Sequence, residues 1–216
     1  MVFDTSALLR EFITLLVVID PIGSLPVFYF AASAVPRALH WRFALRAVFV
    51  AWVVLMGFLI GGQLLLEGVG LRFGSFQIAG GIVLFLFALT MIFGESKPDR
   101  EIEEAGRSDL SGAIFPLAMP SIASPGAMLA VVVLTDNHKN SIPDQIVTAG
   151  LLTIVLGITL LLLLLGSVLK RALGNSGASV ISRVMGIILA TVAVDAVLGG
   201  LAEVGVLNLQ SGSGPL

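Results

Sequence analysis

The stretch Asp-Pro-Ile-Gly-Ser at residues 20–24 interrupts an apolar run that extends from Ser6 to Ala34, and it decides how this chain folds. The run is long enough to cross a bilayer, because about 20 predominantly apolar residues span the hydrocarbon core as a helix. Proline has no amide hydrogen and its ring clashes with the preceding turn, so Pro21 breaks that helix. Lipid cannot satisfy the backbone groups that a break releases, and they must face protein, water or a ligand. The stretch therefore predicts a membrane helix that is broken at a functional position.

Composition indicates a membrane environment along the whole chain. Of 216 residues, 57% are hydrophobic and 12% are charged, whereas a soluble domain carries about 25% charged residues. The mean hydropathy is +1.05. We therefore expect an all-α integral membrane protein with a single transmembrane domain at residues 1–210, and a flexible tail or engineered remnant at residues 211–216. Six segments of spanning length make up the domain: Ser6 to Ala34, Phe43 to Leu66, Phe73 to Phe93, Gly112 to Leu134, Gln145 to Leu169 and Val180 to Leu201.

Charge and residue usage exclude several classes of function. The net charge is -2 and there is no basic block, so nothing in the sequence favours binding of nucleic acid. The absence of cysteine excludes thiolate metal sites and cysteine nucleophiles, and His40 and His138 lie in loops far apart in the sequence. No Gly-x-x-x-x-Gly-Lys-Ser/Thr loop for ATP is present. We expect no metal and no cofactor.

The positions of lysine and arginine predict the orientation in the membrane. With six spans, nine of the 12 Lys and Arg residues fall on the side that holds the loops after segments one, three and five. Cationic loops tend to remain in the cytoplasm during insertion. We therefore expect a multi-pass protein of the cell inner (plasma) membrane, with the charged loop at residues 95–111 in the cytoplasm and both termini outside it.

An internal repeat divides the chain at that loop. Pro21 and Pro125 are separated by 104 residues, and segments three and six match at an offset of 105, where Gly81 aligns with Gly186 and Thr90 with Asp195. The repeats cover about residues 5–94 and 112–201, and each holds three spans, so the second enters the membrane from the opposite side. We expect six transmembrane helices arranged as two inverted three-helix repeats, with helices 1 and 4 broken at Pro/Gly motifs.

Inverted repeats with matching broken helices are typical of secondary transporters, whose sites lie between the breaks near the membrane midplane. A half-helix that begins at Gly23 or Gly126 would present amides and a positive dipole end to an anion. The carbonyls of the departing half-helix suit a cation, so a small zwitterion fits two opposed breaks. For any single proline, a kink or close helix packing is the better explanation. The matched pair of breaks favours the functional interpretation.

The same motifs resemble those of the MarC family of bacterial and archaeal membrane proteins, also called the neutral amino acid transporter family, within the lysine exporter-like group. Residues 20–28 resemble its first-helix Asp/Asn-Pro-x-Gly-x-x-Pro signature, residues 76–82 its third-helix motif, and Pro120 with residues 124–127 its fourth-helix motif. The resemblance extends from about Leu8 to Leu201. It implies six helices and, for the better-understood members, transport of small neutral amino acids such as glycine and alanine. Ser124 stands where the family pattern has glycine, which leaves the substrate open.

The candidate site residues follow from the breaks and from the few polar residues inside the spans. A carboxylate within an apolar segment is costly and usually marks an ion path or a paired site. Asp20 either couples transport to an ion or caps the half-helix that follows the break, and Asp195 either carries a proton or cation or bonds a neighbouring helix. Gln77 either binds substrate or joins helices, and Gly80 serves packing or close approach of substrate. The substrate site is expected to include Asp20, Pro21, Gly23, Ser24, Gln77, Gly80, Ser124, Pro125 and Gly126, with ion or proton coupling at Asp20 and Asp195.

The leading hypothesis is a secondary transporter of small neutral amino acids that works by alternating access, coupled to H+ or Na+, in a direction that the sequence leaves open. One alternative is an exporter or channel for an amino acid or metabolite. Another is an intramembrane enzyme with a dyad of Asp20 and Asp195, but no Gly-x-Gly-Asp motif surrounds Asp195, and we expect no enzyme. The expected partners are the solute, the ion and the lipid bilayer, and homo-oligomerisation stays open.

Overall fold

The computed structural model describes residues 5–32, 35–93, 110–135 and 141–207, and its regular structure over these ranges is entirely helical. Four helices are long and apolar enough to cross a membrane, or five if one bent pair counts as a span. The predicted all-α membrane fold is thus confirmed. The loop expected at residues 95–111 lies almost wholly outside the described residues, and the tail at 211–216 lies outside them. The spans are Arg37–Gly62, Phe73–Phe93, Ile142–Gly166 and Arg183–Glu203, with Ile114–Ile122 and Pro125–Leu134 as the bent pair.

The first apolar segment folds as two helices, α1 (Thr5–Ile19) and α2 (Ser24–Ala31), which flank residues 20–23. They contain 15 and 8 residues, and each is shorter than the roughly 20 residues of a spanning helix. A short 3-10 helix, η1 (Arg37–Leu39), follows. The chain thus turns out of regular helix at the position where the sequence predicts a break.

Two long helices complete the first half. These are α3 (His40–Gly68) and α4 (Phe73–Phe93), and the second has the predicted bounds. They are joined by a tight turn in which Gly70 has a φ of 72°. A residue with a side chain is strained in that left-handed region, so glycine is favoured there.

The fourth segment is irregular before it becomes a helix. It comprises η2 (Leu110–Ala113), a π-type segment η3 (Ile114–Ile122) and α6 (Pro125–Leu134), and η3 and α6 are bent by 48°. Within η3, Phe115 and Met119 have extended backbones, with ψ values of 122° and 128°. Each precedes a proline, whose ring disfavours the α conformation of the residue before it. Sequence chemistry therefore accounts for the irregularity.

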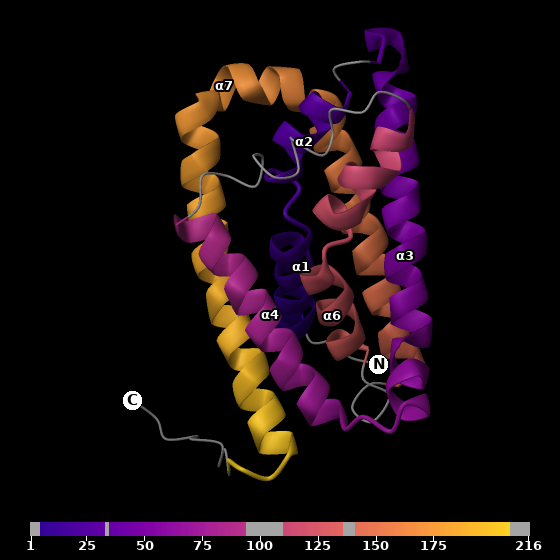
Figure 1. Ribbon diagram of the computed structural model, residues 1–216, viewed down its shortest axis with the longest axis vertical. Helices are drawn as coiled ribbons and strands as arrows, with labels where there is room; N and C mark the ends of the chain where they lie inside the picture. The colour runs from indigo at the N-terminus through magenta and orange to yellow at the C-terminus, as the bar shows by residue number, and fades with distance from the viewer. Residues whose placement is uncertain (1–4, 33–34, 94–109, 136–140, 208–216) are drawn as a thin grey trace.

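The last helix, α7 (Ile142–Glu203), is continuous over 62 residues. Residues 145–169 and 180–201 are predicted as separate segments, whereas helical backbone joins them in the structure. No proline lies between Pro143 and Pro215, so nothing in the chain forces the helix to stop. Figure 1 shows α7 rising on one side of the molecule, crossing its top and descending on the other side.

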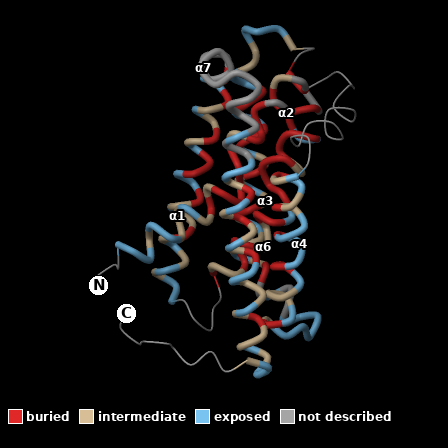
Figure 2. Tube along the Cα trace, turned by 90° about the vertical axis from the view of Figure 1, so that its left-hand side faces the viewer, coloured by how far each residue is buried: buried red, intermediate tan, exposed pale blue. Residues whose placement is uncertain are grey.

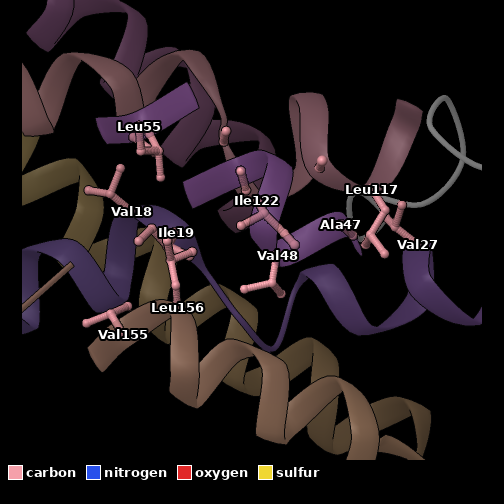
Figure 3. Close-up of a cluster of buried hydrophobic side chains, with 14 of the residues drawn as sticks. Val18, Ile19, Val27, Ala47, Val48, Leu55, Leu117, Ile122, Val155 and Leu156 are labelled. Carbon is pink, nitrogen blue, oxygen red and sulfur yellow. The ribbon is translucent and has the colours of Figure 1, made fainter. Parts of the chain in front are cut away.

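The short elements lie in the middle of the molecule, between two pairs of long helices. Figure 1 shows α1, α2 and α6 between α3 with the first part of α7 on one side, and α4 with the last part of α7 on the other. Buried residues are concentrated in this middle, as Figure 2 shows. The outer helix faces expose large apolar residues such as Ile60 and Phe93, as expected for surfaces that contact lipid. The core combines residues from α1, α3, η3 and α7, including Val18, Ile19, Val48, Leu55, Ile122 and Leu156 (Figure 3).

Candidate functional site

The first break is organised by Asp20. Its backbone has a φ of 47°, a left-handed conformation that aspartate adopts more readily than most residues. This turn ends α1, and the Asp20 Oδ1 atom then accepts a hydrogen bond of 3.0 Å from the amide of Gly23. The Asp20 carbonyl accepts hydrogen bonds from the amide and the hydroxyl of Ser24, both at 3.2 Å. Asp20 therefore caps the start of α2, the structural one of the two roles that the sequence left open.

The second break is organised in the same way by Ser124. Its backbone is extended, and its Oγ atom accepts a hydrogen bond of 3.1 Å from the amide of Ala127. Pro125 occupies the first helical position of α6, where its missing amide hydrogen has no cost. In each break a polar side chain thus bonds the amide three residues later, and a proline directly follows the capping residue.

The two breaks lie against each other. The hydroxyl of Ser121, at the end of η3, donates a hydrogen bond of 3.1 Å to the Ser24 hydroxyl at the start of α2. These residues are 97 positions apart in the chain. The structure therefore brings together Asp20, Gly23 and Ser24 from one half with the segment of Ser121 and Ser124 from the other.

This cluster is closed to solvent. Ser24 and Ser121 have an exposed fraction of 0%, and Asp20 and Ser124 have 2%. Pro125, beside Ser124, is exposed, so the accessible surface ends one residue from the second break. The cluster is thus enclosed by the helices around it.

The caps change one expectation about charge. The sequence suggests that both half-helices offer amides to a bound anion. In the structure the amide of Gly23 is already bonded to the Asp20 carboxylate, and the amide of Ala127 is bonded to the neutral Ser124 hydroxyl. The start of α2 carries its own negative group, whereas the start of α6 keeps a positive dipole end without a charged cap. The two breaks therefore have different electrostatic character.

Gln77 and Gly80 lie on α4 and face other helices. A methyl group at Gly80 would come within 3.1 Å of Leu129 in α6, and the amide nitrogen of Gln77 lies against Gly199 of α7. The Gln77 Oε1 atom is buried and has no hydrogen-bond partner among the described residues. Gly80 thus serves close packing with α6, and the contacts of Gln77 join α4 to α7.

Asp195 lies on an exposed face of α7. The α4-facing side of that helix carries Ala193 and Val197, which surround Gly81, and at 100° per residue Asp195 points about 160° away from Ala193. Asp20 is buried and Asp195 is exposed, which does not suit a pair of carboxyl groups that share a proton in a dry site. The described geometry thus gives the predicted coupling residues two different environments.

Glycine contacts between α4 and α7 repeat with a fixed offset. A methyl group at Gly81 would lie 2.7 Å from the carbonyl oxygen of Ala193, and one at Gly186 would lie 3.1 Å from that of Ala88. The offset is 105 both between Gly81 and Gly186 and between Ala88 and Ala193. Each glycine therefore packs closely against the alanine of the other helix.

Two residues with polar contacts, Ser121 and Glu11, are not among the predicted site residues. Ser121 was overlooked although it lies between Pro120 and the second break. Glu11 of α1 accepts a hydrogen bond from the Thr148 hydroxyl of α7. Its spacing of four and eight residues from the buried Leu15 and Ile19 puts Glu11 on the inner face of α1, and this pattern could have revealed it.

Comparison with known proteins gives a consistent result. The model of a family described as MarC family integral membrane protein matches residues 5–204. A UPF0056 membrane protein from Archaeoglobus fulgidus is 33% identical over 89% of this chain and 91% of its own length. The UPF0056 inner membrane protein YhgN from Escherichia coli strain K12 is 30% identical over 88% of this chain and 93% of its own length. No solved structure matches.

Proposed function

Because this chain belongs to the MarC family of integral membrane proteins, we propose that it is a secondary transporter that carries small neutral amino acids of the glycine and alanine class by alternating access. The observation that carries this proposal is the hydrogen bond between Ser24 and Ser121, which joins the two breaks at the centre of the molecule. In transporters with inverted repeats, substrate binds where equivalent broken helices face each other.

The inverted repeat is part of the proposal, and two pairs of contacts support it. The caps of Asp20 on Gly23 and of Ser124 on Ala127 are related by an offset of 104. The contacts of Gly81 and Gly186 across α4 and α7 are related by an offset of 105. Unrelated helices have no reason to repeat both a cap and a packing contact at nearly one spacing.

Six spans make this arrangement complete. We take α1 with α2 as a first, broken span, η3 with α6 as the fourth, and the two long parts of α7 as the fifth and sixth. The start of α1 and the end of α7 lie toward the same end of the molecule in Figures 1 and 2, as an even number of crossings requires. The basic residues then favour extracytoplasmic termini and a cytoplasmic central loop.

The contrast between the two breaks supports a zwitterionic solute. The Asp20 carboxylate suits an ammonium group, since a carboxylate has about four acceptor positions and can both cap a helix and bind a cation. The uncharged cap at Ser124 leaves the positive end of α6 for a carboxylate. Glycine and alanine carry both groups within a few ångströms and have no large side chain that a closed site would exclude.

Coupling to H+ or Na+ belongs to the same proposal. Asp20 is the coupling residue nearest the solute, and an intramembrane carboxylate is a common site for a proton or cation. Asp195 is a second coupling residue if water reaches its face of α7. Export or channel-like conduction of the same solutes is the alternative; the closed cluster, with Ser24 and Ser121 at 0% exposure, favours a carrier over an open pore.

The test is uptake of radiolabelled glycine and alanine into proteoliposomes under an imposed proton or sodium gradient. We expect saturable, protein-dependent uptake that collapses when the gradient is dissipated. Empty liposomes give the background. Thr159→Val is the control variant, because Thr159 is buried and its hydroxyl bonds only the Val155 carbonyl of its own helix. Absence of protein-dependent flux for both amino acids would refute the proposal, and flux that does not saturate would favour the channel.

A further inference from the structure

The hydroxyl of Ser121 is a buried polar group with a partner in the other half of the chain. It donates to Ser24, whose hydroxyl in turn donates to the Asp20 carbonyl, so the three residues form a short chain of hydrogen bonds. Ser24 and Ser121 have no contact with solvent. A buried hydroxyl that loses its acceptor is destabilising, so separation of the breaks requires a new acceptor for the Ser121 hydroxyl, whereas the Ser24 hydroxyl keeps the Asp20 carbonyl.

We propose that Ser121 is a substrate-binding residue, and that its bond to Ser24 is the contact that closes the empty site and is exchanged for a carboxylate oxygen of the solute. The inference rests on the proposed function and adds a residue and a step to it. When the half-helices part, Ser121 keeps a donor and loses its acceptor. A solute carboxylate supplies that acceptor beside the uncharged cap of α6, while the Ser24 hydroxyl keeps its bond to the Asp20 carbonyl and can accept a hydrogen bond from the ammonium group.

Two features of the chain support this exchange over a purely structural role. The buried hydroxyls of Thr135 and Thr159 bond a carbonyl one turn earlier in their own helix, and such bonds survive rigid movement of the helix. The Ser121 bond, like the bond of Thr148 to Glu11, crosses between elements of the two halves, and separation of the two breaks must disrupt the Ser121 bond. It also lies directly between the two breaks, at the start of α2 and the end of η3.

The first experiment compares Ser121→Ala, Ser121→Thr and Thr159→Val in glycine flux. Loss of one hydrogen bond to a charged group should raise the apparent KM of Ser121→Ala roughly tenfold or more, while the maximal rate changes less. Ser121→Thr keeps the hydroxyl and should restore the KM, and Thr159→Val should not alter it. An unchanged KM in Ser121→Ala would overturn the inference while leaving the proposed function intact.

The second experiment does not depend on transport. The chain contains no cysteine, so Ser121→Cys and Thr159→Cys each provide a single thiol. We expect a water-soluble maleimide to modify the Cys at position 121 in membranes, since the site opens, and glycine or alanine to slow that reaction severalfold. The thiol at position 159 should stay unreactive. The inference would be overturned if neither thiol reacted with the maleimide, or if neither amino acid slowed the labelling at position 121. If an amino acid slowed labelling at position 121 but no flux were measured, binding at Ser121 would be upheld and the transport proposal would fail.

Discussion

Replacement of Asp20 separates its role as a cap from its role as a charge. Asparagine keeps an acceptor oxygen for the amide of Gly23 and tolerates a φ of 47°. Alanine loses the cap, which lowers the free energy of unfolding by about 1 kcal/mol. The left-handed backbone at this position lowers it by roughly a further 1–2 kcal/mol. Glycine loses the cap but adopts that backbone freely. The structure thus predicts that Asp20→Asn lowers the free energy of unfolding by less than about 1 kcal/mol and Asp20→Ala by roughly 2–3 kcal/mol, with Asp20→Gly between them.

The measurement is chemical unfolding of the three variants in mixed micelles, together with flux in proteoliposomes at several pH values and sodium concentrations. For Asp20→Asn we expect folded protein in near-normal amount and flux that has lost its dependence on the coupling ion. If Asn and Ala destabilise the protein equally, the capping geometry is refuted. If flux of Asp20→Asn keeps its ion dependence and falls only with protein abundance, Asp20 is a cap and carries no coupling.

Two further substitutions test the packing around the breaks and the repeat. Gly23→Ala should be strongly destabilising, because the new methyl group would overlap the Asp20 carboxylate, whereas at Gly126 the nearest atom to a new methyl group is in the flexible Leu84 side chain, at 3.1 Å. Thermal melting in detergent should give a much larger loss of stability for Gly23→Ala, and equal losses would contradict the geometry of the first break. Gly81→Ala should weaken the contact between α4 and α7 by roughly 1–3 kcal/mol through overpacking, while Gly57→Ala, which meets nothing within 4 Å, should be neutral or slightly stabilising through helix propensity. An equally mild effect at both positions would argue against close contact of these helices.

The sequence indicates irregular backbone near Pro21 and Pro125, where α1 ends before α2 begins and where α6 begins, because the cause is local. Proline lacks an amide hydrogen wherever it occurs, so Pro21 and Pro125 marked the ends of regular helix without any knowledge of the tertiary structure. The bounds of α4 were predicted by its apolar run, which lies between Arg72 and Glu95. Capping was one of two open roles for Asp20, since sequence alone does not show whether a carboxylate folds back on the next turn.

Contacts between distant segments could not be predicted in the same way. The bond between Ser24 and Ser121 depends on how two half-helices pack, and the exposure of Asp195 depends on which side of α7 meets α4. The continuity of α7 was missed for another reason. Polar residues at a membrane surface are compatible with either a loop or a helix, and only a proline would have decided the matter.

A structure of the protein with glycine bound would test the central claim most directly. Our account predicts density for the amino acid between the two breaks, with its carboxylate near Ser121 and the start of α6, its ammonium group near Asp20, and the hydroxyls of Ser24 and Ser121 no longer bonded to each other. Density at another position, for example beside Gln77 or Asp195, with the Ser24–Ser121 bond intact, would contradict it.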